Sequence, residues 1–239
     1  MKKQIFLATV LAFGAFFTTK AQEYLSIEMN DNTIHEFRVA SIKEVKIRVS
    51  GEDPNYPIAD AIDLGLPSGT KWASWNIGAS KPEECGGYFA WGETEEKSYY
   101  DWSTYSHCDG SNETCHHIGE DIAGTSYDVA HVKWGGNWTM PTRDQIEELI
   151  DNCKKTWSSR NGVKGFIVTG PNGGSIFLPA VGYYYSDRLD YEGDFAFYWS
   201  SSLSLSNKKN ALYLGFGSDF WYWGDGERCY GQPVRPVCP

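Results

Sequence analysis

Cysteine and histidine residues are concentrated in one short segment of this sequence. The stretch "HCDGSNETCHH" contains His107, Cys108, Cys115, His116 and His117. Zinc binds cysteine and histidine side chains, so this composition is compatible with a zinc site. The spacing matches no common zinc module, however, and in an oxidising compartment two cysteines this close form a disulfide more readily. The sequence therefore predicts a Cys108–Cys115 disulfide, and zinc is the alternative.

The remaining cysteines extend this prediction. The chain has six cysteines, the other four being Cys85, Cys153, Cys229 and Cys238. An even number of cysteines in an exported chain indicates a disulfide framework whose pairing the sequence does not define. A bridge from Cys153 or Cys229 to Cys238 is one possibility besides the local Cys108–Cys115 pair.

An acidic segment, "SDRLDYEGDF", carries Asp187, Asp190, Glu192 and Asp194. Calcium takes several oxygen ligands, which these carboxylates could supply. Their spacing differs from that of the twelve-residue calcium loop of helix-loop-helix proteins. The segment is therefore predicted to be a solvated acidic loop. No cofactor is predicted, and calcium is the alternative.

Consecutive aromatic residues form the most unusual segment, "GSDFWYWGDGERCYG". Side chains alternate between the two faces of a strand, so Phe220 and Tyr222 share one face, whereas Trp221 and Trp223 share the other. One pair should pack on the core and the other should face solvent. Exposed rings beside carboxylates suit sugar binding, because rings stack on the apolar faces of sugars and carboxylates accept hydrogen bonds from hydroxyls. The alternative is that loops cover both faces and all four rings belong to the core.

The predicted binding face combines these aromatic residues with the acidic ones. Its contacts are Asp219, Trp221, Trp223, Asp225, Glu227 and Tyr230, with Asp190 and Asp194 at the rim. The expected ligand is a glycan or a surface protein, since protein interfaces are also enriched in Trp and Tyr. The sequence contains no G-x-S-x-G, H-E-x-x-H or phosphate-binding G-x-x-x-x-G-K-[ST] motif. No catalytic residue is predicted.

The start of the chain predicts export. Lys2 and Lys3 precede an apolar segment that is too short to cross a bilayer, and Ala21 provides a small-residue cleavage site. Residues 1–21 therefore read as a signal peptide, and no later segment is apolar enough to span a membrane. The formal net charge of −10, which becomes more negative when the signal peptide is removed, argues against a nucleic-acid partner.

Residues 22–50 are predicted to form a small β module. Apolar residues alternate in three runs between Tyr24 and Val49, which indicates a hairpin followed by a third strand. Residues 51–58 are rich in Pro and acidic residues and are predicted to be a linker.

Residues 59–239 are predicted to form one domain of short strands with one or two helices. A helix follows Thr142, which should cap it in a capping box with Gln145, and a shorter helix should run from Asp128 to Trp134 and end at Gly135. Two strands, 165–169 and 175–178, should be joined by a turn at 171–174, and further strands are expected at 196–203, 210–216, 220–223 and 232–238. This pattern indicates the α+β class.

Six motifs in this region resemble a known family. They are "DLGLPSGTKWASWNIGA", "GGYFAWGE", "WGGNWTMPT", "NGVKGFIVTGPNGGSIFLPAVGY", "YWSSS" and "VRPVC". In this order they resemble the Fibrobacter succinogenes major paralogous domain. The strands of residues 22–50 resemble the small β module that often precedes such domains in exported proteins of Bacteroidetes.

The resemblance implies a C-type-lectin-like fold whose termini pair and whose long loops present a ligand surface at 186–231. The tryptophans of these motifs are expected in the core. Gln232-Pro233 is followed by Val234, which departs from the triplets of calcium-dependent sugar-binding lectins. We therefore expect an exported, non-catalytic binding module. One alternative is an assembly subunit of a cell-surface structure that associates through edge pairing of the 24–49 strands. The other is an enzyme of the oxidase type, which would require a redox-active cysteine pair and a bound metal and rests on fold analogy alone.

Overall fold

A computed structural model describes residues 24–28, 34–38 and 56–239. The chain divides into two units, Met1–Ile47 and Arg48–Pro239. In the first unit, β1 (Tyr24–Glu28) and β2 (Ile34–Arg38) pair as an antiparallel hairpin. The predicted hairpin is thus confirmed, whereas the third strand expected near Val49 and residues 51–55 of the predicted linker lie outside the described residues.

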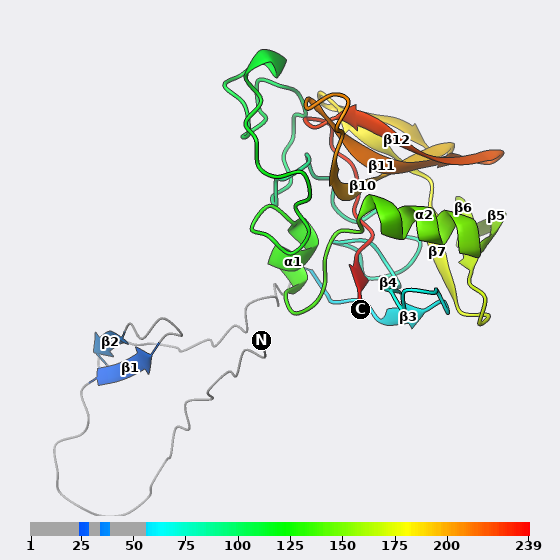
Figure 1. Cartoon of the computed structure of the whole chain (residues 1–239), viewed down its shortest axis with the longest axis horizontal. Coiled ribbons are helices and arrows are strands. Elements are labelled where there is room, and N and C mark those ends of the chain that lie inside the picture. The colour runs from blue at the N-terminus through cyan, green and yellow to red at the C-terminus, as the bar shows by residue number, and fades with distance from the viewer. Residues whose placement is uncertain (1–23, 29–33, 39–55) are drawn as a thin grey trace, which may run out of the picture. The chain divides into compact units, whose positions relative to one another are not determined.

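The second unit is built mainly of strands (Figure 1). Its largest sheet has the strand order β12-β11-β10-β8-β9, in which only the β10–β8 pair is parallel. These strands are β8 (Val181–Tyr185), β9 (Arg188–Glu192), β10 (Phe195–Leu203), β11 (Asn210–Gly217) and β12 (Phe220–Glu227). One face of this sheet packs on the core, so the other face is free to form a site.

Helix α2 (Arg143–Asn152) lies against the core face of the sheet, below β10–β12 in Figure 1. Thr142 and Gln145 form the predicted capping box, and Ile146 and Leu149 are buried. Helix α1 (Val129–Trp134) begins after Asp128, whose carboxylate accepts the Ala130 and His131 N–H groups. It ends at Gly135, where φ is 65°, a conformation that glycine adopts without a Cβ clash. Both predicted helices are confirmed.

Two smaller sheets complete the unit. One is an antiparallel meander of β5 (Lys154–Arg160), β6 (Val163–Thr169) and β7 (Ser175–Pro179). The other has the order β13-β4-β3, with strands β3 (Ala61–Asp63), β4 (Lys71–Ala73) and β13 (Val237–Cys238). Among the described residues of the unit, the first and last strands therefore share one sheet, and β13 pairs with β4 as expected for a domain whose termini pair. The strand predicted at 232–238 is limited to these last two residues, and β3, β4, β5, β8 and β9 were not predicted. The segment predicted to be a solvated acidic loop instead contains β9, because its residues pair with β8 as an antiparallel strand.

The core contains many aromatic side chains, and the strands outnumber the helices as the α+β class predicts. Among the tryptophans expected inside, Trp72, Trp91, Trp134 and Trp199 are buried, while Trp75 and Trp138 are half-buried. A long connection, residues 74–128, joins β4 to α1 and contains only the short 3₁₀ helix η2 (Asn112–Thr114) and isolated bridges. No helix among the described residues is long and apolar enough to cross a membrane.

Candidate functional site

The free face of the five-stranded sheet carries an aromatic groove with a volume of about 390 Å³. Every strand of the sheet contributes to it. Its aromatic lining is Tyr183 from β8, Tyr191 from β9, Phe195 and Phe197 from β10, Tyr213 from β11, Phe220 and Tyr222 from β12, and Tyr230. Asp225, Gly226 and Gln232 complete the lining. We call this surface the aromatic groove.

Glycines in the strand register allow the rings to lie on the floor of the groove. Tyr222 pairs with Gly215, Phe220 with Gly217, and Tyr213 with Gly224. A Cβ atom at position 215 would lie only 2.8 Å from Cζ of Tyr222, a distance at which the ring would have to shift. The absence of side chains at these positions therefore lets the tyrosine rings tilt over the backbone of the neighbouring strand.

Contacts between rings hold the aromatic residues in place. Phe195 stacks on Phe220 with centroids 5.6 Å apart, and Phe197 meets Tyr213 edge to face at 5.4 Å. Tyr183 contacts Tyr230 at 5.3 Å. Offset and edge-to-face pairs at these distances are mutually stabilising. The floor is thus fixed before a ligand arrives, which reduces the entropy lost on binding.

Tyr191 adopts a strained backbone conformation at the edge of the groove. Its φ is 63°, in the left-handed region that bulky residues rarely occupy, and its side chain is 53% exposed. The ring nevertheless stacks on Tyr183 with centroids 6.0 Å apart and meets Phe195 edge to face at 5.3 Å. Strain that places an exposed ring over a groove is typical of binding sites.

The polar groups of the groove are few. Tyr213 and Tyr222 place their hydroxyl oxygens 3.4 Å apart. Burial raises the pKa of the Tyr213 and Tyr230 hydroxyls, so both are protonated at neutral pH and can donate hydrogen bonds. Asp225 accepts a hydrogen bond from Oγ of Ser204 at 2.7 Å. The groove can therefore offer rings to an apolar surface and a few donors and acceptors to hydroxyls.

The structure brings some of the predicted contact residues to this groove. Asp225 and Tyr230 line it, and Asp190 pairs in register with Tyr183 at its edge. Asp190 holds Arg188 through two charge-assisted hydrogen bonds of 2.7 and 2.9 Å. Asp194 is exposed and lies 3.5 Å from the Lys164 ammonium, away from the lining.

Other predicted contact residues lie elsewhere. Trp221 faces the core, where it stacks on Phe216 at 5.0 Å and meets Phe166 edge to face at 5.1 Å. Asp219 is exposed in the β11–β12 turn, and Glu227 accepts a hydrogen bond from Nε1 of Trp102 at 3.1 Å. The alternation predicted for 220–223 is present, but the pair on the groove is Phe220 and Tyr222 rather than the two tryptophans.

Trp223 belongs to a second, more polar groove of about 580 Å³. The Arg143 guanidinium lies over its ring at 4.1 Å from the centroid, while Glu147 pairs with Arg143 at 2.8 Å. Acidic residues and serines dominate the rest of the lining: Glu120, Asp121, Asp144, Ser202, Ser204, Ser206 and Asp225. Asp225 is shared with the aromatic groove, so the two grooves adjoin at this residue.

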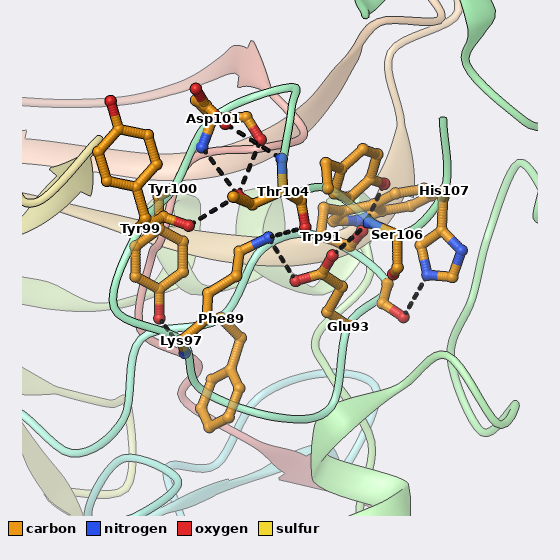
Figure 2. A network of polar contacts seen from close by, with 12 residues as sticks. Phe89, Trp91, Glu93, Lys97, Tyr99, Tyr100, Asp101, Thr104, Ser106 and His107 are labelled. Atoms are coloured by element: carbon orange, nitrogen blue, oxygen red, sulfur yellow. Dashed lines mark hydrogen bonds and ion pairs between the residues drawn. The ribbon is translucent and has the colours of Figure 1, made fainter. Parts of the chain in front are cut away.

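A network of polar contacts holds the 89–107 loop (Figure 2), and this loop contacts Tyr184 of β8 and Glu227 at the end of β12. The Lys97 ammonium lies between the Glu93 carboxylate at 2.8 Å and the Thr104 carbonyl oxygen at 3.1 Å. Tyr100 of this loop contacts the ring of Tyr184 at 5.6 Å, and burial raises its pKa to about 12. The loop therefore fixes the back of β8 through ring contacts and the end of β12 through Trp102.

The cysteine and acidic segments form no metal centre in the described part of the chain, where no three Cys, His, Asp or Glu side chains converge. All six cysteines are present as thiols, and Sγ of Cys108 donates to the Trp102 carbonyl oxygen at 3.1 Å. His116 contacts Asp109 at 3.1 Å, and His107 contacts the Gly92 carbonyl oxygen at 2.9 Å. The Cys108–Cys115 disulfide is not formed here and stays a prediction.

Sequence reasoning missed most of the groove. The lining residues that it did not predict as contacts are Tyr183, Tyr191, Phe195, Phe197, Tyr213, Phe220, Tyr222, Gly226 and Gln232. A usable signal was present in "YLGFG" and "FWYWGDG", where aromatic residues and glycines recur at every second position. When the strands are paired, this pattern places rings opposite glycines on one face.

Comparisons with protein-family models, with curated proteins and with solved structures give no match for this chain. The resemblance to the major paralogous domain therefore rests on its sequence motifs alone.

Proposed function

We propose that this protein is an exported, non-catalytic binding module that recognises a glycan through the aromatic groove. The observation that carries the proposal is the groove floor, to which every strand of the sheet contributes a ring and on which the rings of β11 and β12 lie opposite glycines. Rings exposed in this way stack on the apolar faces of sugars, while hydroxyl and carboxylate groups bond to sugar hydroxyls. The aromatic groove lies within the predicted 186–231 face, except for Tyr183 and Gln232.

A C-type-lectin-like fold is part of the same proposal. It is supported by the pairing of the last strand, β13, with β4 near the start of the unit. The long 74–128 connection, which contains no strand or α-helix, provides the loop-rich character expected of that fold. Export and cell-surface location are supported by the signal-peptide pattern of residues 1–21.

A glycan screen with matched variants tests the function. We expect the protein to bind glycans, Tyr222→Ala and Phe220→Ala to abolish binding, and Tyr99→Ala to bind like the wild type. Tyr99 is the control because its exposed fraction of 41% lies between those of Phe220 (43%) and Tyr222 (39%), while it lies outside the groove. Binding that survives both groove substitutions would contradict the proposal, and EDTA should have no effect, since calcium is not part of it.

The alternative function, an assembly subunit, is favoured by one observation. Within the described residues, β1 and β2 pair only with each other, so each offers an outer edge for strand addition. Sedimentation at high protein concentration tests this alternative. A strictly monomeric protein would contradict it.

A further inference from the structure

Gln232 differs from the other lining residues because its side chain is polar and almost completely buried. It is 2% exposed, and its Oε1 atom has no hydrogen-bond partner among the described residues. Buried polar atoms are nearly always paired in folded proteins. An unpaired acceptor that lines a groove is therefore an indication that the ligand supplies the missing donor.

The backbone of Gln232 is fixed without help from its side chain. Its N–H donates to the Phe89 carbonyl oxygen at 3.0 Å, and its own carbonyl oxygen accepts the Phe89 N–H at 2.9 Å. The flanking Gly231 makes a similar bridge to Tyr184. Since these bonds hold the chain in place, the side-chain amide is not required to position the strand.

The groove leaves an approach to this amide. Gly226 also lines the groove, and a Cβ atom at this position would lie 3.5 Å from Nε2 of Gln232. The same Cβ position lies 3.1 Å from Cε1 of Tyr213, and Tyr230 lines the same groove. A sugar ring that stacks on these tyrosines would therefore bring its hydroxyls towards the floor at Gln232.

The charge of the groove restricts the class of sugar that can bind there. Asp225 is the only charged residue in the lining of the groove in the described part of the chain. Its carboxylate repels carboxylated and sulfated sugars, and no cation in this lining compensates for it. The protein as a whole is also acidic, with a formal net charge of −10.

We propose that Gln232 is the specificity-determining residue of the aromatic groove, and that its amide hydrogen-bonds a hydroxyl of a neutral sugar unit stacked on the tyrosines. This inference rests on the proposed glycan-binding function and adds to it the class of sugar and the residue that selects it. A hydroxyl that reaches Oε1 satisfies the buried acceptor, whereas a sugar without that hydroxyl leaves it unpaired.

The test uses affinity electrophoresis of the protein in gels that contain one polysaccharide each. The neutral probes are mannan, xyloglucan, barley β-glucan and pullulan, and the acidic probes are polygalacturonate and alginate. The variants are Gln232→Met, which removes the amide at similar volume, Tyr222→Ala and the control Tyr99→Ala. Heat-denaturation midpoints are measured for each variant.

We expect retardation by at least one neutral polysaccharide and by neither acidic one. Gln232→Met should weaken binding at least tenfold, and it should melt at the same temperature as the wild type or higher, because it removes an unpaired buried acceptor. A lower melting temperature would assign the amide a role in folding and overturn the inference.

The failure of this inference is distinguishable from the failure of the proposed function. Neutral-glycan binding that is lost in Tyr222→Ala but unchanged in Gln232→Met would overturn the role of Gln232 alone. Retardation by the acidic polysaccharides would overturn the neutral class of sugar. If the wild type binds none of the probes and no glycan in the screen, both the proposed function and this inference fail.

Discussion

The ring of Trp221 stacks on the ring of Phe216, with centroids 5.0 Å apart and planes inclined by 13°. Phe216 is fully buried on β11, and Trp221 also meets Phe166 of β6. Trp221 thus joins the five-stranded sheet to the β5–β7 meander. Its neighbour Tyr222 lies on the opposite face, so one of these adjacent aromatic residues packs on the core and the other lines the aromatic groove.

This arrangement predicts that two neighbouring substitutions change stability by very different amounts. Trp221→Ala should lower the free energy of unfolding by about 3 kcal/mol, since it removes a large ring from the edge of the core. Tyr222→Ala should change it by less than about 1 kcal/mol, because that ring is 39% exposed. Urea denaturation of both variants measures the difference. Equal destabilisation by the two substitutions would contradict this assignment of faces.

The alternation at 220–223 was predictable, but the outward face was not. Side chains alternate between the two faces of a strand, so Phe220 and Tyr222 can be assigned to one face and the two tryptophans to the other from the sequence alone. Which two rings are buried depends on the residues of the neighbouring strand that lie beside them. Here Phe216 and Leu214 of β11 are buried on the core side, whereas Gly215 and Gly217 lie on the groove side.

Local signals predicted the helices and several strands well. Thr142 and Gln145 formed the expected capping box because capping depends on residues close in sequence. The groove depends instead on residues 183–232 meeting across five strands and on one left-handed residue, Tyr191. No local pattern predicts that strand order, so Gln232 and Tyr183 were not recognised as parts of one site.

Gly215 provides a test of the groove floor. A methyl group at this position would approach Cζ of Tyr222 to 2.8 Å and push the ring away from the floor. We expect Gly215→Ala to weaken glycan binding while the protein remains folded, because a tyrosine ring at the surface can move. Far-UV circular dichroism controls for folding. Wild-type affinity in a folded Gly215→Ala variant would show that the ring position does not matter.

Arg235 is expected to be essential for stability. It is 1% exposed, and its guanidinium donates to Oδ1 of Asn76 at 2.7 Å and to the carbonyl oxygens of Ala73 and Phe177 at 3.0 and 2.9 Å. These bonds join β4, β7 and the segment before β13. Burial lowers the pKa of this guanidinium to about 10, so it is charged at neutral pH.

Removal of this hydrogen-bonded group should be costly. Arg235→Ala should lower the free energy of unfolding by more than about 3 kcal/mol, since it leaves buried acceptors unpaired and opens a cavity. The control is Arg160→Ala, because Arg160 is 53% exposed and its ion pair with Glu83 spans 3.3 Å. In this control the free energy of unfolding should fall by less than about 1 kcal/mol. Similar urea midpoints for the two variants would contradict a structural role of Arg235.

The proposed export can be tested by counting the thiols of the isolated protein. If the protein reaches an oxidising compartment and the predicted Cys108–Cys115 bridge forms there, the denatured protein should show fewer than six reactive thiols. Peptide mapping without reduction should then recover these two cysteines in one linked fragment. Six reactive thiols in protein isolated without reductant would show that every cysteine is free, as in this structure.

His107 predicts a pH dependence of stability. Burial lowers its pKa below the ordinary value of 6.5, and its ring lies edge to face with Tyr105 and Tyr127 at 5.4 and 5.2 Å. The hydrogen bond with the Gly92 carbonyl oxygen and the charge of Glu93 oppose this shift in pKa, whereas Arg228 and His116 add to it. In the unfolded chain the imidazole takes up a proton near its ordinary pKa, while the folded protein keeps it neutral.

The sign of the effect follows from this difference. As the pH falls below about 6.5, the unfolded state binds more protons at His107 than the folded state does. The free energy of unfolding therefore decreases as the pH falls. Urea midpoints at pH 7.5 and 5.5 should therefore differ less in His107→Gln than in the wild type. The control His117→Gln, an exposed histidine of the same segment, should keep the wild-type difference. An unchanged difference in His107→Gln would show that another group causes the pH dependence.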